Sequence, residues 1–259
     1  MLIEVIGYLF FIFMGICLGL TGAGGSVLTI PILIYVYKIP VILSTTYALF
    51  IVGVTSLLAF FQYWSLVSYH KIWKLIIPCV MGVFISRAYI LHNIPEMICG
   101  IRRDSIIIIL IAVFMFFSAY KMIKGAKKES LHIIYPPSNI ISFLFISFSL
   151  GIAVGLLGVG GGSLVTSALI LFLGYEIRHA VATSLLIIML NSFVGFISDP
   201  TLLTLDDYKR ICLFSIFSII GMVISIYISK RAHPYNLKNL FGWIMFSASL
   251  MLIIREFFF

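Results

Sequence analysis

The chain has 259 residues, of which 62% are hydrophobic and only 10% are charged, and its mean hydropathy is +1.20. A soluble domain is about half apolar and about one quarter charged, so no soluble fold of this size buries so much apolar surface. The formal net charge of +8 fits the excess of Lys and Arg on cytoplasmic loops. No hydrophilic stretch is long enough for a nucleic-acid-binding face. We therefore predict a polytopic membrane protein.

Apolar stretches along the chain have the length of membrane-spanning helices, for which ~20 residues are needed. In chain order they cover residues 3–20, 42–61, 75–91, 105–122, 140–157, 181–197, 211–228 and 240–254. Two shorter apolar pieces, at 27–37 and 164–173, follow glycine-rich breaks and are too short to cross a membrane alone. A lysine-rich linker at 124–138 separates a first unit, 1–123, from a second unit, 139–259, and its charge places it in the cytoplasm.

The two units share a repeated motif. GICLGLTGAGGSVLTIPIL, which starts at Gly15, aligns with GIAVGLLGVGGGSLVTSAL, which starts at Gly151, at an offset of 136 residues with nine of nineteen positions identical. Later, GVFIS at Gly82 aligns with GMVIS at Gly221. We therefore predict an all-α bundle of two homologous repeats, each with a glycine-broken first helix and three further helices.

The relative orientation of the repeats depends on the two short apolar pieces. If each piece continues a simple crossing, every repeat has four crossings and the repeats are parallel. If each piece turns back as a re-entrant half-helix, three crossings remain and the repeats are inverted. The count of Lys and Arg residues on the cytoplasmic side favours the inverted arrangement by a single residue. We predict inversion.

The glycine-rich breaks are the predicted substrate site. Non-helical backbone inside a membrane is tolerated only where protein or a water-filled cavity satisfies it. A helix that begins after such a break presents free N–H groups and the positive end of its dipole to an anion. Gly15, Gly19, Gly151 and Gly155 have the spacing of helix-packing glycines. The predicted binding residues at the breaks are Gly22, Gly24, Gly25, Ser26, Gly158, Gly160, Gly161, Gly162 and Ser163.

Charged and polar residues narrow the class of substrate. Every carboxylate falls at a segment end or in a loop, whereas proton relays and cation sites usually place one within the membrane. This favours a neutral or anionic substrate held by N–H and hydroxyl groups, with Thr183, Ser184 and Asn191 in support. Arg87 is either a counter-charge for the anion or an arginine that extends to the interface. We expect no metal, no cofactor and no enzymatic activity, because no catalytic motif is present.

The motifs GLTGAGGSVLTIPIL, GLLGVGGGSLVTSAL and HAVATSLLIIMLNS resemble those of the sulfite exporter TauE/SafE family over nearly the whole chain. This resemblance implies a transporter of a small organosulfur anion or sulfur oxyanion, such as sulfite or a sulfonate. It places the glycine motifs, Thr183 and Ser184 at the family's conserved positions. The chain departs from the family at Thr46-Tyr47-Ala48-Leu49, where Gly-Thr-Ser-Leu is usual, and at Ser167, which replaces the proline that matches Pro31.

The resulting hypothesis is a multi-pass transporter of a prokaryotic inner (plasma) membrane. It predicts alternating access by rocking of the two halves, with the anion between the two glycine breaks near the bilayer midplane. The coupling ion, proton or sodium, the direction of transport and the oligomeric state stay open. Two alternatives stay open as well: a transporter or flippase of a neutral or lipidic substrate, and a membrane scaffold that transports nothing.

Overall fold

The computed structural model describes residues 2–21, 25–67, 72–98, 101–125, 140–158, 160–162, 165, 166, 168, 169, 175, 177–229 and 234–258. Most of the predicted linker, as well as Gly22, Gly24 and Ser163, lies outside these residues.

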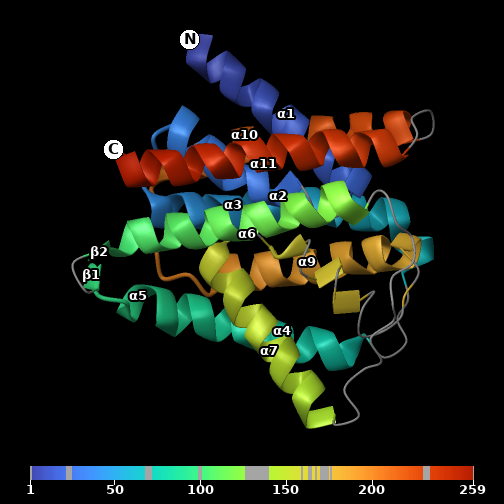
Figure 1. The fold of residues 1–259 in the computed structure, drawn as a ribbon, viewed down its shortest axis with the longest axis horizontal. Helices are drawn as coiled ribbons and strands as arrows, with labels where there is room; N and C mark the ends of the chain where they lie inside the picture. The colour runs from blue at the N-terminus through green and yellow to red at the C-terminus, as the bar shows by residue number, and fades with distance from the viewer. Residues whose placement is uncertain are drawn as a thin grey trace.

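Long helices form most of the described chain, and all the long stretches expected from hydropathy are helical (Figure 1). The chain is almost everywhere apolar, so a helix that satisfies its own backbone groups is the conformation a bilayer permits. The helices are α1 (Leu2–Thr21), α2 (Gly25–Pro31), α3 (Val41–Tyr63), α4 (Trp73–Ile85), α5 (Leu91–Asn93), α6 (Arg103–Gly125), α7 (Ile140–Leu157), α9 (Ile177–Ile197), α10 (Leu205–Ser229) and α11 (Pro234–Phe258).

Short elements of other types connect or extend the helices. The π-helix η1 (Ile32–Val36) continues α2, the 3₁₀-helix η2 (Trp64–Leu66) ends α3, and the π-helix η3 (Ser86–Ile90) joins α4 to α5. The strands β1 (Met97–Ile98) and β2 (Ile101–Arg102) pair in an antiparallel hairpin before α6. The described chain confirms the predicted all-α class, and this short hairpin is an addition that the sequence analysis did not expect. It is too short for the alternating pattern that identifies a strand.

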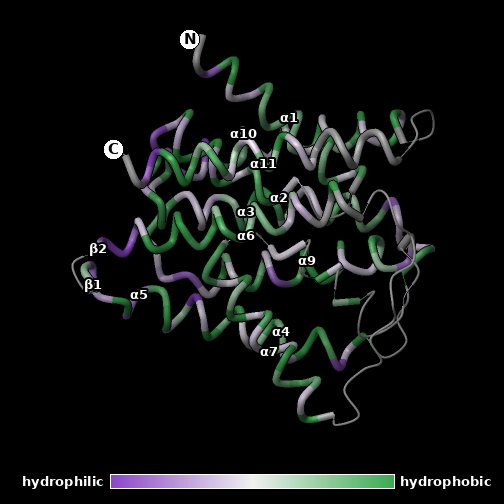
Figure 2. Tube along the Cα trace, viewed as in Figure 1, coloured by the Kyte–Doolittle hydropathy of each residue, from purple (hydrophilic) through white to green (hydrophobic). Residues whose placement is uncertain are grey.

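Hydrophobic residues follow the helices along nearly their whole length, and hydrophilic ones gather at helix ends and connections (Figure 2). Five helices of the described chain are long and apolar enough to cross a membrane: Val41–Leu66, Trp73–Asn93, Arg103–Tyr120, His179–Ile197 and Leu205–Ile228. The outer faces keep large apolar side chains exposed, among them Phe61, Phe117 and Phe145. Such a surface requires an apolar solvent.

The first helix and the short piece after the first break form a helical hairpin. Near the break, Gly25 packs on the backbone of Met14 and Leu18 in α1, and a β-carbon at Gly25 would collide with both. At the other end of the hairpin, Tyr37 lies against Gly7 and donates a hydrogen bond of 3.3 Å to the carbonyl of Glu4. The short piece α2 and the residues up to Tyr37 therefore run back along α1, as the re-entrant alternative expects.

Glycines allow two pairs of helices to approach each other closely. In the α1–α10 pair, Gly15 faces the carbonyl of Ser218, and Gly221 faces the carbonyl of Ile12. In each case a β-carbon would overlap the partner's backbone. These contacts confirm that Gly15 is a packing residue, because only a glycine lets the two backbones come so near.

The α4–α7 pair repeats this arrangement. Gly151 faces the carbonyl of Cys79, and Gly82 faces the carbonyl of Phe148. Gly19, one turn after Gly15, contacts Ser225, which lies after Ser218, so α1 runs parallel to α10. Likewise Gly155, one turn after Gly151, contacts Ser86, which lies after Cys79, so α4 runs parallel to α7. In Figure 1, α1 and α7 lie at opposite sides of the bundle.

Two further pairs are antiparallel and lie between these. In the α3–α9 pair, Gly53 contacts Ser192, while Gly195, further along α9, contacts Leu49, earlier in α3. In the α6–α11 pair, Phe116 stacks near Phe246 with ring centroids 5.3 Å apart. Gly242, earlier in α11, instead contacts Ile123, later in α6. The second glycine break contacts both α3 and α9.

Candidate substrate site

The second glycine break has a backbone that most residues do not adopt. Gly158, Gly160 and Gly161 have φ values of +66°, +68° and +72°. This left-handed region costs other residues roughly 1–2 kcal/mol each, so glycine is needed here. These three glycines and Gly162 are buried. The break thus places an irregular turn inside the bundle, at the end of α7.

Side chains from α3, η3, α9 and α7 itself surround this turn. Gly158 lies against Thr45 of α3 and against Nη2 of Arg87. Gly160 lies against Ser192 of α9. Gly161 packs on Val154 of its own helix. The structure therefore brings Arg87 to the second break, which is one of the predicted binding loops.

The first break is described only from Gly25 onward. Gly25 and Ser26 are both buried. Gly25 makes the close contact with α1 that holds the hairpin together, so its small size serves packing. Thr29, one turn further along α2, is buried as well, and its hydroxyl has no hydrogen-bond partner within the described chain.

Arg87 is completely buried, with 0% of its surface exposed. The interpretation of Arg87 as an arginine that extends to the interface is therefore wrong. The side chain belongs to η3, and a π-turn inserts one extra residue into the helix, which changes the face that the following residues present. Its Nη1 atom donates to Thr45 Oγ1 and to Asp199 Oδ2, each at 3.0 Å.

Asp199 is the site residue that the sequence analysis missed, since it was assigned to a segment end. Its side chain is fully buried and forms an ion pair with Arg87. The Asp-Pro-Thr sequence ends α9: the residue before a proline avoids helical geometry, and an Asp side chain readily binds the backbone two residues on. Accordingly, the backbone N–H of Thr201 donates to Asp199 Oδ1 at 3.0 Å. The dipeptide Asp199-Pro200 was the sequence feature from which this turn at the end of α9 could have been predicted.

Neutral groups complete the surroundings of Asp199. Thr46 Oγ1 donates to Asp199 Oδ2 at 2.8 Å, and Thr201 Oγ1 donates to Asp199 Oδ1. The Nε2 atom of His92 lies 3.6 Å from Asp199 Oδ1. Next to this cluster, Tyr47 donates to Asp207, whose second oxygen receives the backbone N–H and the hydroxyl of Thr204. This last arrangement caps the N-terminus of α10.

The predicted polar residues of α9, namely Thr183, Ser184 and Asn191, are all buried. Ser184 donates to the carbonyl of Val181 in its own helix at 2.8 Å, a common way to satisfy a serine in a helix. Asn191 donates from Nδ2 to Cys79 Sγ of α4 at 3.3 Å. The expectation that Asn191 has a partner is confirmed for its amino group.

Buried polar atoms without partners concentrate near the second break. A buried polar group without a hydrogen bond is unusual and costs roughly 1–3 kcal/mol. Close to this break, Gly155 lies against Ser86. Within the described chain, the unpartnered atoms near the break are Ser86 Oγ, Arg87 Nε, Arg87 Nη2 and Ser192 Oγ, and Asn191 Oδ1, next to Ser192 in the sequence, is unpartnered as well. These atoms are available to a polar ligand.

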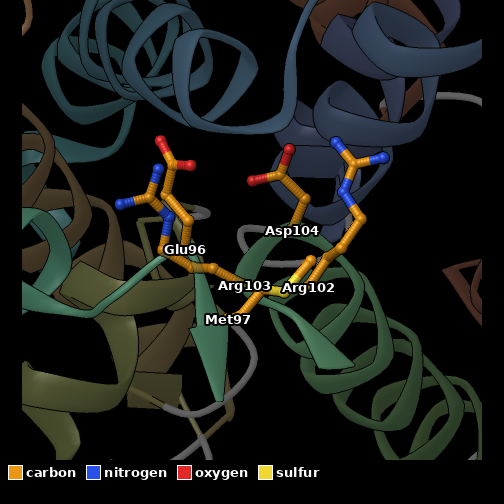
Figure 3. Close-up of a pocket in the computed structure, with 5 residues that line it drawn as sticks. All are labelled: Glu96, Met97, Arg102, Arg103 and Asp104. Atoms are coloured by element: carbon orange, nitrogen blue, oxygen red, sulfur yellow. The ribbon is translucent and has the colours of Figure 1, made fainter. Parts of the chain in front are cut away.

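A separate pocket lies at the β1–β2 hairpin (Figure 3). Arg103 donates from Nη1 to the carbonyl of Ile94 at 3.2 Å. The lining side chains carry both signs of charge, so the pocket has no bias toward an anion. They are Glu96, Met97, Arg102, Arg103 and Asp104.

An apolar helical bundle with a buried, incompletely paired polar cluster at a glycine break is the construction of a membrane transport protein. The comparison with known families agrees: the chain belongs to the Sulfite exporter TauE/SafE family, whose match covers residues 8–252. The family is one of membrane transporters, and the chain is an integral membrane protein.

One curated relative shows local similarity. The Probable membrane transporter protein YunE of Bacillus subtilis (strain 168) is 45% identical over 53 residues, which are 20% of this chain and 19% of that protein. The match thus covers about a fifth of the relative's length. No solved structure matches this chain.

Proposed function

We propose that this protein transports a small anion, of the organosulfur or sulfur-oxyanion type, and that Arg87 binds it beside the second glycine break. The observation that carries the proposal is the pairing state of Arg87. Its side chain is fully buried, and its Nε and Nη2 atoms have no partner among the described residues. A buried guanidinium with free donors favours a ligand that carries negative charge.

The geometry of the free donors narrows the class of ligand. In a guanidinium, Nε and one Nη group share an edge and donate two parallel hydrogen bonds, which suits two oxygens of one oxyanion. Asp199 holds Nη1, so the edge formed by Nε and Nη2 remains for the ligand. Sulfonates, sulfite and carboxylates carry two such oxygens. The family description, which names sulfite, favours the sulfur anions among them.

The predicted loop and α9 residues contribute the rest of the proposed site. Backbone N–H groups around Gly160–Ser163 and the unpartnered Ser86 and Ser192 hydroxyls are donors for further oxygens. Thr183, Ser184 and Asn191 support this wall of the site. From the first break, the corresponding contribution would come from Gly22, Gly24, Gly25 and Ser26.

We also propose the inverted two-repeat architecture, with units 1–123 and 139–259. The support is the reciprocity of the glycine contacts. At the motif offset, Gly15 corresponds to Gly151, and Ser218 occupies in α10 the place that Cys79 has in α4. The contact of Gly15 with Ser218 therefore has the same form as that of Gly151 with Cys79. The corresponding helices α3 and α9 are antiparallel, which suits an axis in the membrane plane.

Alternating access follows as the proposed mechanism, and the close glycine contacts decide which parts move together. Because α1 packs on α10 and α4 packs on α7, each half is joined to the other by backbone contacts. We therefore propose that α1 moves with α10 and that α4 moves with α7, rather than one half moving against the other. The membrane would be a prokaryotic inner (plasma) membrane.

A substitution of Arg87 tests the function. Purified protein in proteoliposomes is expected to take up labelled sulfite or methanesulfonate, and sulfonates and carboxylates should compete. Arg87→Lys keeps a positive charge but has no bidentate edge, so uptake should fall at least about tenfold, as expected for the loss of one charged hydrogen bond. Arg210→Lys, a change at an exposed arginine, is the matched control and should transport normally.

The rival functions make different predictions in the same experiment. A transporter of neutral or lipidic cargo would show no competition by these anions and no loss in Arg87→Lys. A scaffold would show no uptake, and no oxyanion would raise the melting temperature of the purified protein. Either result would contradict the proposed anion site.

A further inference from the structure

A line of interacting side chains leads from the protein surface to the buried arginine. His92, in α5, has 30% of its side chain exposed, whereas the side chains of Asp199 and Arg87 are completely buried. His92 Nε2 lies 3.6 Å from Asp199 Oδ1, and Asp199 Oδ2 lies 3.0 Å from Arg87 Nη1. The partly exposed imidazole of His92 therefore connects the buried Arg87–Asp199 ion pair to the protein surface.

The hydrogen bonds of His92 fix the nitrogen at which it gains a proton. Its Nδ1 atom lies 3.3 Å from the backbone carbonyl of Arg87. A carbonyl oxygen only accepts hydrogen bonds, so Nδ1 carries the hydrogen of the neutral ring. The Nε2 atom lies 3.3 Å from Thr201 Oγ1, whose hydrogen is donated to Asp199, and it faces the carboxylate of Asp199. A second proton therefore binds at Nε2 and points to the carboxylate.

The groups that face Asp199 come from each element around it. Arg87 of η3 supplies the cation, and His92 of α5 supplies the titratable imidazole. From α3, the neutral hydroxyl of Thr46 donates to the carboxylate, and the neighbouring Tyr47 is engaged by Asp207 of α10. Asp207 is in turn held by the cap at Thr204. Within the described chain, His92 is thus the titratable group placed to change the charge balance of the Arg87–Asp199 pair.

We propose that the His92–Asp199 pair takes up one proton when an oxyanion binds to Arg87, so that the protein moves the anion together with a proton. This inference rests on the proposed anion site. Without ligand, Arg87 and Asp199 cancel each other and His92 is neutral. With ligand, the anion compensates Arg87 while protonated His92 compensates Asp199. The proton comes from the aqueous phase, binds at Nε2 and leaves by the same atom.

Electrostatics makes the two events depend on each other. An anion alone would leave the cluster with a net negative charge in a medium of low polarity, and a proton alone would leave it with a net positive charge. Both states are expensive to bury. When anion and proton bind together the cluster stays neutral, so each raises the affinity for the other by the same factor. Sodium fits less well, because Arg87 repels a cation next to Asp199.

Proton movement measured together with anion uptake tests this coupling. Proteoliposomes that contain a pH-sensitive dye are given methanesulfonate or thiosulfate, which stay unprotonated from about pH 5 to 8, the range in which histidine titrates. The wild-type protein should acidify the lumen as methanesulfonate enters, with one proton per anion. Its apparent KM for methanesulfonate should fall as the pH is lowered, by at most about tenfold per pH unit, as linkage to a single proton requires.

Two variants separate the coupling from the binding of the anion. His92→Gln keeps the Arg87–Asp199 pair, and it should still transport methanesulfonate but lose most of the pH dependence and of the proton movement. Asp199→Asn imitates the protonated pair and should bind the anion with an affinity that no longer depends on pH. If Asp199→Asn does not fold, the result for His92→Gln alone tests the coupling of proton and anion. His179→Gln, at the opposite end of α9, is the matched control and should keep the wild-type pH dependence.

The outcomes distinguish failure of the coupling from failure of the function. Wild-type uptake without lumen acidification, or a His92→Gln variant with unchanged pH dependence and proton movement, would overturn the coupling and leave the anion site standing. If neither anion is taken up at any pH and neither raises the melting temperature, the proposed function fails, and the coupling fails with it.

Discussion

Arg87 and Asp199 lie 112 positions apart in the chain, yet Arg87 Nη1 and Asp199 Oδ2 are 3.0 Å from each other and both side chains are fully buried. The pair joins the η3 segment to the end of α9. It also leaves two donor atoms of Arg87 unused. The same pair therefore holds the fold together and prepares the proposed site, and the two roles can be separated by mutation.

The first prediction concerns the stability of this pair. Arg87→Leu should lower the free energy of unfolding by about 3–5 kcal/mol, because it leaves a buried carboxylate without its counter-charge. Asp199→Asn should be destabilising for the converse reason. The double variant should lose clearly less than the sum of the two, since no uncompensated charge remains. Unfolding in detergent, followed by circular dichroism, measures all four states of this cycle.

Lys209 and Asp206 provide the control cycle. Their ion pair of 3.0 Å is exposed on α10, where such pairs contribute little to stability. Lys209→Leu and Asp206→Asn should therefore be close to neutral and additive. If the Arg87–Asp199 cycle is equally additive, the buried pair does not act as a unit.

The second prediction concerns the close helix contacts. Gly15→Ala places a methyl group on the backbone of Ser218, which cannot move aside as a side chain can. We expect a loss of roughly 1–3 kcal/mol in stability, as for an overpacked core. Gly53→Ala is the matched control: it is also a buried glycine in a helix, but its β-carbon would lie 3.3 Å from the nearest atom, in the side chain of Ser192. The melting temperatures of the two variants test this prediction. Equal decreases in melting temperature would contradict the packing role of Gly15.

The third prediction is that Ser192→Ala affects stability and anion binding in opposite directions. Its buried hydroxyl has no partner in the described part of the protein. Ser192→Ala removes an unsatisfied polar group, so the free energy of unfolding should stay the same or rise by up to about 1–3 kcal/mol. The affinity for sulfite should fall, because a donor of the proposed site is lost. Thermal unfolding and anion uptake are measured on the same preparation.

Ser215→Ala is the control for Ser192→Ala. Its hydroxyl, also buried, donates to the carbonyl of Ile211 at 2.8 Å. Loss of this bond should cost about 0.5–1.5 kcal/mol and leave the affinity unchanged. If Ser192→Ala behaves in the same way as Ser215→Ala, the hydroxyl of Ser192 has no part in binding.

Hydropathy was sufficient to predict the helices, because nearly every residue of a spanning helix meets lipid or another apolar helix. The repeated glycines likewise predicted where α1 and α7 end, since no helix propagates easily through such a motif. The β1–β2 hairpin escaped prediction because two residues per strand carry no periodic signal. Helix ends also differ: α10 begins at Leu205, earlier than hydropathy indicates, because its cap uses the polar residues Thr204 and Asp207.

The polar cluster could be predicted only in part. Arg87 was conspicuous as an arginine within an apolar stretch, but its partner depends on three local conformations at once. The π-turn sets the face of Arg87, the Asp-Pro-Thr turn directs Asp199 inward, and the start of α3 places Thr45 beside them. None of these three local conformations can be predicted from the amino-acid composition. The predicted roles of Gly160, Asn191 and the other site residues stay predictions until transport is measured.

The glycine contacts also bear on whether the part of the chain before the linker could form this bundle by itself. Gly15 and Gly82 both precede the linker, but each has its backbone partner after the linker. A chain that ended before the linker would leave both surfaces open. Under the proposed repeat, a second copy of that short chain, inserted upside down, would offer Cys79 to Gly15 and Ile12 to Gly82. Under that proposal, the chain would be equivalent to an antiparallel homodimer whose two subunits are joined by the linker, so the two halves would not need to keep identical residues.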